Sequence, residues 1–195
     1  MNTTTMMMIA AVAMISTAAV AADYDNTAVK LTAQSDAYSI SVKAPETGAT
    51  EFAVGTTAGP VDLTGTWSRN GAVDNYAIKA GKEMAVVGPV YAGASAEFTF
   101  GDSYTTDTRT LVATPYVGVA HTMGQLTPYA EAGYAWKSTS NDVLNFARND
   151  SYLEVGASYA VTPAMAVKLS VSETRDVDFK NAGDRNATVG VTVNF

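Results

Sequence analysis

The chain has 195 residues, 47% of them hydrophobic, and its 12 Lys and Arg against 19 Asp and Glu give a net charge of −7. This acidic balance gives no electrostatic support for nucleic-acid binding, so we expect no nucleic-acid partner. Because the sequence contains no cysteine, a disulfide framework and a thiolate metal site are excluded, and no motif indicates a cofactor or a metal.

Residues 1–22 are uncharged and largely apolar, and they end in the small side chains of Ala19, Ala21 and Ala22. Such a segment is typical of a signal peptide and is at the lower limit of length for a membrane-spanning helix. We therefore predict a cleaved signal peptide over 1–22 and one mature domain over 23–195, with a retained anchor as the alternative. No later segment is apolar for long enough to span as a helix, so a membrane location would require strands.

After the leader, apolar and polar residues alternate with the period of a β-strand. In the final segment Val189, Val191, Val193 and Phe195 share one face. The alternating segments, in chain order, are 38–43, 51–55, 61–68, 76–81, 90–100, 116–120, 129–136, 153–161, 165–172 and 187–195. The first two have the weakest patterns, so we expect ten strands or, without them, eight. The role of residues 23–59 is left open.

Charged residues within these segments lie on the face opposite the apolar one. They are Glu51, Lys79, Glu97, Glu131, Glu154 and Lys168. Charges of both signs on a single face favour a polar lumen in which they pair, because isolated buried charges are costly. We expect them to pack as structural salt bridges, and a selective channel is the alternative. Inward glycines at 93, 118, 133, 156 and 190 are expected to leave room for Tyr91, Tyr116 and Tyr129.

Alternation alone also fits a soluble secreted β-sandwich, but two further patterns favour a membrane barrel. Connections are short at one end, as at 121–125 and 162–164, and long at the other, as at 138–150 and 173–185. Aromatic residues of the apolar face concentrate near the long loops, as transmembrane barrels place them at the membrane interface. These residues are Trp67, Phe98, Phe100, Tyr134 and Trp136.

From about Val90 to Phe195 the chain resembles the small outer-membrane β-barrel family, porin-like proteins that include OmpA-type and OmpX-type barrels. The resemblance is carried by the hairpin 151–172 about Thr162-Pro163 and by the terminal strand 189–195. It implies an all-β, closed, antiparallel, up-and-down transmembrane barrel in the bacterial outer membrane. It also implies that Phe195 resembles the terminal signal read by the barrel-assembly machinery.

All five arginines fall in or beside the predicted long loops: Arg69, Arg109, Arg148, Arg175 and Arg185. A guanidinium group binds phosphate through two parallel hydrogen bonds, so we expect contacts with lipopolysaccharide, and ordinary solvated loop charge is the alternative.

Barrels of this size that act as enzymes carry a His near a Ser or acidic residues at the outer rim. The single histidine of this chain, His121, lies at a short turn instead, so we expect no catalytic activity.

We therefore expect a non-enzymatic outer-membrane protein with a structural or surface-interaction role in the envelope. A small-solute or ion channel is the first alternative, and the soluble sandwich is the second. The oligomeric state, the surface partner and the source organism are left open.

Overall fold

The computed structural model describes residues 24–70, 73–102, 108–139, 148–176 and 182–195. The predicted signal peptide lies outside the described residues. Within those ranges, no helix is long and apolar enough to cross a membrane.

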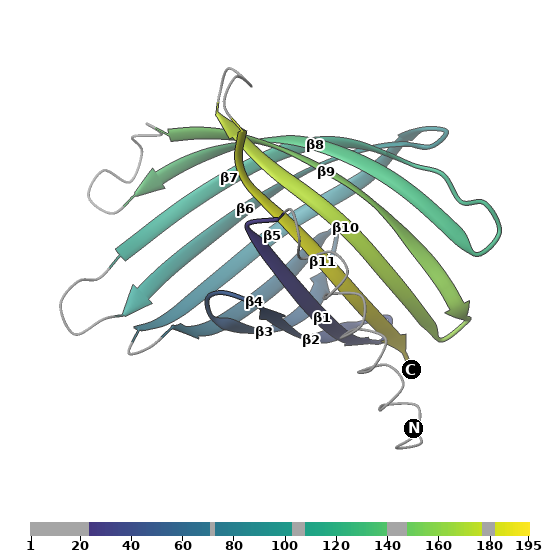
Figure 1. Ribbon diagram of the computed structural model, residues 1–195, viewed down its shortest axis with the longest axis horizontal. Coiled ribbons are helices and arrows are strands. Elements are labelled where there is room, and N and C mark those ends of the chain that lie inside the picture. The colour runs from purple at the N-terminus through teal and green to yellow at the C-terminus, as the bar shows by residue number, and fades with distance from the viewer. Residues whose placement is uncertain (1–23, 71–72, 103–107, 140–147, 177–181) are drawn as a thin grey trace.

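The described residues form eleven strands of a single sheet that closes into a barrel (Figure 1). The strands are β1 (Asn26–Gln34), β2 (Tyr38–Pro45), β3 (Thr50–Ala58), β4 (Val61–Asn70), β5 (Val73–Val87), β6 (Val90–Asp102), β7 (Thr108–Ala120), β8 (Leu126–Thr139), β9 (Arg148–Thr162), β10 (Met165–Asp176) and β11 (Ala182–Asn194). Each strand pairs antiparallel with the next, and β1 pairs parallel with β11 to close the barrel. One closed sheet excludes the two packed sheets of a sandwich.

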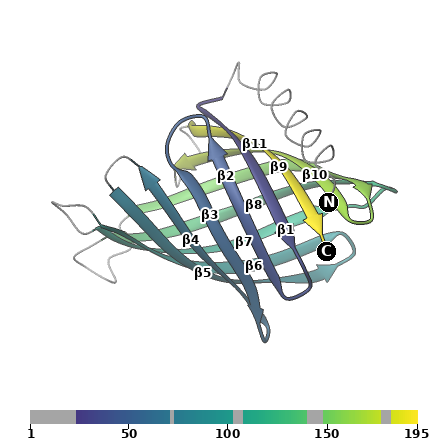
Figure 2. The same cartoon turned by 90° about the horizontal axis from the view of Figure 1, so that it is seen from below.

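The prediction of ten or eight strands is wrong because residues 26–34 form an additional strand. Figure 2 shows β1 between β2 and β11. An up-and-down chain with an odd number of strands starts and finishes in the same direction, so the closing pair is parallel. The expected all-antiparallel arrangement is therefore corrected at this one seam, where Val29 faces Val189 and Leu31 faces Val191.

The two ends of the barrel differ in their connections. One end, called the short-turn end, carries the connections 35–37, 59–60, 88–89, 121–125 and 163–164. Gly59, Gly88 and Gly124 adopt positive φ angles of 62°, 56° and 64° in these turns, which glycine does without steric cost. The opposite, long-loop end carries 46–49 and the connections that contain residues outside the described ranges. Strands extend into the predicted loops 138–150 and 173–185, so Arg148 and Arg175 lie on strand ends.

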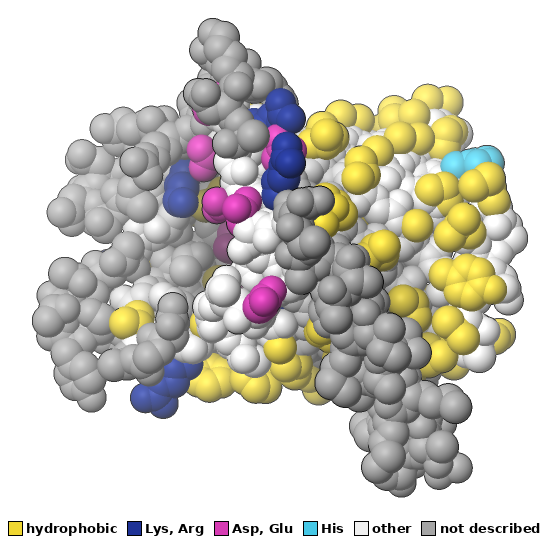
Figure 3. Space-filling model, viewed as in Figure 1, with side chains coloured by type: hydrophobic (Ala, Val, Ile, Leu, Met, Phe, Trp, Pro, Cys, Tyr) yellow, Lys and Arg dark blue, Asp and Glu magenta, His cyan; other side chains and the backbone are white. Residues whose placement is uncertain are grey.

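Apolar side chains are spread over the outside of the barrel (Figure 3). Polar side chains line the cavities inside it. Ile78, Val117 and Val155 are 58%, 52% and 46% exposed on the outward face. This inversion of a soluble protein's arrangement is what a barrel in lipid requires. Val189 and Val191 of the terminal strand share the outward parity but are buried. An exposed outward residue such as Ile78 is therefore the better position at which to test contact with lipid.

Candidate functional site

Four tyrosines of β6–β9 have side chains on the lumen side, each opposite a glycine of the neighbouring strand. The pairs are Tyr91 with Gly118, Tyr116 with Gly93, Tyr129 with Gly156, and Tyr152 with Gly133. A Cβ atom at any of these glycines would overlap the ring of its tyrosine. The glycines therefore provide the space in which the rings lie flat against the wall, as the sequence predicted for three of the tyrosines. Tyr152 was missed because the predicted segment 153–161 begins one residue after it.

Two glutamates accept hydrogen bonds from three of these rings. We call the four rings and the two carboxylates the tyrosine wall, comprising Tyr91, Tyr116, Tyr129, Tyr152, Glu131 and Glu154. Glu131 accepts hydrogen bonds from Tyr91 Oη (3.1 Å) and Tyr152 Oη (2.5 Å). Glu154 accepts one from Tyr129 Oη (2.5 Å) and lies 3.5 Å from Lys168 Nζ. The same ammonium lies 4.4 Å from the centre of the Tyr129 ring, which adds a cation–π contact.

The other predicted lumen charges also find polar neighbours. Glu51 lies 3.8 Å from Lys43 Nζ. Lys79 is directly opposite Glu97 in the register of β5 and β6, and Glu97 accepts a hydrogen bond from Thr99 Oγ1 (3.4 Å). Glu51, Glu154 and Lys168 thus take part in ion pairs, whereas Glu131 accepts hydrogen bonds from neutral hydroxyl groups.

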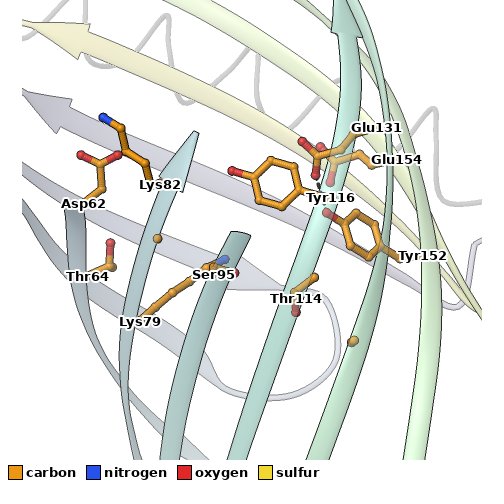
Figure 4. A pocket seen from close by; sticks show the side chains of 12 residues that line it. Asp62, Thr64, Lys79, Lys82, Ser95, Thr114, Tyr116, Glu131, Tyr152 and Glu154 are labelled. Atoms are coloured by element: carbon orange, nitrogen blue, oxygen red, sulfur yellow. Dashed lines mark hydrogen bonds between the residues drawn. The ribbon is translucent and has the colours of Figure 1, made fainter. Parts of the chain in front are cut away.

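Polar cavities occupy the lumen between the tyrosine wall and β1–β5. A cavity of about 460 Å³ lies beside the wall, with Tyr116, Tyr152 and Glu131 on one side and Asp62, Thr64 and Lys79 across from them (Figure 4). A second, of about 360 Å³, is lined by residues of β1–β4 and β11. A third, of about 230 Å³, lies at the short turn 35–37. Thr64 lines all three, so the cavities adjoin one another.

Outside the barrel, aromatic side chains form a row near the long-loop end. Phe52, Trp67, Tyr76 and Phe100 occupy one line of the register across β3–β6. The ring centres of Phe52 and Trp67 are 5.4 Å apart, and those of Tyr76 and Phe100 are 5.1 Å apart. This aromatic row has the composition and position of the aromatic belt of a membrane barrel.

Four of the five arginines lie on the same outward face as the aromatic row, at the loop ends of their strands. Arg69 follows Trp67 by two residues, and Arg109 is directly opposite Phe100. Arg175 and Arg185 flank Glu173, with Nη2 of Arg175 at 2.6 Å and Nε of Arg185 at 3.2 Å from its carboxylate. Arg148 is opposite Lys137 and has the inward parity, and its side chain lies outside the described residues.

The described residues contain no group of three His, Asp or Glu side chains that could hold a metal ion. His121 lies exposed in the connection between β7 and β8. The described residues present a polar lumen and, near the long-loop end, outward guanidinium groups.

The family model of the outer membrane protein beta-barrel domain matches residues 8–195 of this chain. A comparison with curated proteins gives no match.

Proposed function

The chain belongs to the outer membrane protein beta-barrel domain family and is located in the bacterial outer membrane, and we propose that it is a non-enzymatic structural and surface-interaction protein there. The observation that supports this role most directly is the position of the arginines. Arg69, Arg109, Arg175 and Arg185 have the outward parity near the long-loop ends of their strands. We expect this level of a membrane barrel to lie where lipid headgroups begin. A side chain placed there meets the phosphates of the surrounding lipid.

The cluster of Glu173, Arg175 and Arg185 is the best-formed part of this surface. The Glu173 carboxylate contacts both guanidinium groups, so the two forks are restrained. Guanidinium forks bind phosphate oxygens in pairs, and restraint lowers the entropy lost on binding. We propose that this cluster binds a lipopolysaccharide phosphate and that Arg69 and Arg109 add weaker contacts around the barrel.

The test is lipopolysaccharide binding by the Arg175→Gln/Arg185→Gln variant, measured with the full barrel in an uncharged detergent. Partly exposed charge contacts contribute roughly 0.2–1 kcal/mol each, so we expect the loss of two of them to weaken binding by between about twofold and thirtyfold at low salt. The difference should shrink at high salt because the contacts are screened. Lys137→Gln removes a charge of inward parity and is the matched control. Equal binding by the double variant and the control would refute the proposal.

The adjoining polar cavities favour a second role, the passage of small polar solutes. They extend from the short turn 35–37 to Lys43 and Glu51 near the other end of the shorter strands. The tyrosine wall occupies only the β6–β9 side of the lumen, so the β1–β5 side is lined mainly by hydroxyl and ammonium groups. A steady current through the purified protein in a planar bilayer is the expected result for this role, and its absence would exclude it.

A further inference from the structure

Three lysines lie in one line of the lumen across the seam that closes the barrel. Lys168 on β10 faces Gly190 on β11, Gly190 faces Lys30 on β1, and Lys30 faces Lys43 on β2. All have the inward parity. Like charges directly opposite one another on neighbouring strands are destabilising, so the pair of Lys30 and Lys43 needs compensation.

The two outer lysines of this row have glutamate partners. Lys168 lies 3.5 Å from Glu154, and Lys43 lies 3.8 Å from Glu51. Among the described residues no carboxylate forms an ion pair with Lys30. Three lysines against two glutamates leave one uncompensated positive charge, and it is centred on Lys30.

Lys30 faces a space that a small ligand can occupy. The cavity of about 360 Å³ is lined by Lys30, Lys43 and Glu51, and otherwise mainly by hydroxyl-bearing residues. Thr192, Thr32 and Ser41 follow one another in the next line of the register toward the short-turn end. Hydroxyl groups donate hydrogen bonds to anions, and Lys30 is solvent-exposed within the lumen, so an anion can reach both.

We propose that this cavity binds a small free oxyanion, such as inorganic phosphate or a small carboxylate. The ammonium of Lys30 provides the charge, and the hydroxyl groups of Thr32, Ser41 and Thr192 provide neutral donors. Lys43 contributes less because Glu51 already neutralises it. The site lies inside the barrel and is separate from the arginines of the outer surface, and it does not require the lumen to conduct.

Calorimetric titration of the full barrel with inorganic phosphate, in an uncharged detergent at low salt, tests the proposal. We expect saturable binding, and Lys30→Gln should weaken it about tenfold, the loss expected for a hydrogen bond to a charged group. Lys30→Arg should retain most of the affinity because the charge stays. Lys79→Gln is the matched control, because Lys79 is a lumen lysine that lines the neighbouring cavity and is directly opposite Glu97. This substitution should change phosphate binding less than about twofold.

Thr32→Val provides a second variant with unchanged charge, and it should weaken phosphate binding while leaving the folded barrel intact on a heat-modifiability gel. The proposal is overturned if the natural chain shows no saturable binding, or if Lys79→Gln weakens binding as much as Lys30→Gln. Because the titration measures binding and not current, a barrel that conducts nothing leaves the expected result unchanged.

Discussion

Gly133→Ala tests how tightly the tyrosine wall is packed. The added methyl group would overlap the Tyr152 ring, whose hydroxyl donates a 2.5 Å hydrogen bond to Glu131. Forcing extra volume into a packed site costs about 1–3 kcal/mol. A lost hydrogen bond to a charged acceptor adds roughly 1.5–3 kcal/mol, reduced here because water in the lumen replaces part of it. We expect a loss of about 2–4 kcal/mol in the free energy of unfolding.

Gly190→Ala is the matched control for this substitution. Gly190 also faces the lumen, but a Cβ atom there would meet its nearest neighbour, Cβ of Lys168, at 3.7 Å, an ordinary contact. Replacing glycine by alanine where the backbone allows it stabilises by roughly 0.4–1 kcal/mol through the unfolded state. Gly65→Ala, on the outward face with nothing within 4 Å, should behave in the same way.

Urea unfolding of the protein in lipid vesicles, followed by the fluorescence of Trp67 and Trp136, measures these differences. In a Tyr152→Ala background the ring is absent, so Gly133→Ala should cost far less than in the natural chain. This coupling between the two positions is the specific signature of the proposed packing. The reasoning is refuted if the two substitutions are additive, or if Gly133→Ala and Gly190→Ala have equal effects.

Two further predictions concern the faces of Ile78 and Ala77 and the exposed terminal residue Phe195. Ile78→Arg, on the lipid side, should lower the free energy of unfolding in vesicles by about 2–4 kcal/mol, whereas Ala77→Arg, on the lumen side, should lower it much less. Equal losses in urea unfolding would contradict the assigned faces. Phe195 is 84% exposed, so Phe195→Ala should have little effect on the free energy of unfolding in vitro. It should instead slow assembly in cells, measured as the folded fraction on a gel. A loss of stability in vitro that matches the loss of assembly would point to a packing role instead.

Much of the fold was predictable from local pattern because a strand exposed to lipid on one face must alternate along its length. Each of the ten alternating segments overlaps one strand from β2 to β11, and the face assignments of Glu131, Glu154 and Lys168 follow from the same parity. The inward parity of Arg148 was also readable, because it shares the parity of Tyr152 and Glu154. Because Arg148 falls within the predicted loop 138–150, the sequence pattern assigned it no strand face.

The lysine row was not predictable, because it depends on a long-range pairing. Residues 26–34 carry a weak pattern: Ala28 occupies an inward position, and the alternation runs only from Val29 to Gln34. Without β1, Lys30 has no assigned face, and Lys168 and Lys43 belong to different ends of the chain. Only the closing seam places the three ammonium groups in one line, so the candidate anion site appears at the step that local pattern cannot reach.

The closing seam itself is testable with a disulfide, because the natural chain has no cysteine. Thr32 and Thr192 are direct partners on β1 and β11, and both face the lumen. Neighbouring strands lie about 4.8 Å apart, within the range that a disulfide bridges. Thr32→Cys/Thr192→Cys should therefore form a cross-link under mild oxidation in the folded barrel. If the barrel instead closed with ten strands, β2 would lie against β11, and Ser41→Cys/Thr192→Cys would form the cross-link. Because Thr32 lies between Ser41 and Thr192 in the register, the second pair should stay reduced, and its cross-linking in place of the first would refute the eleven-stranded closure.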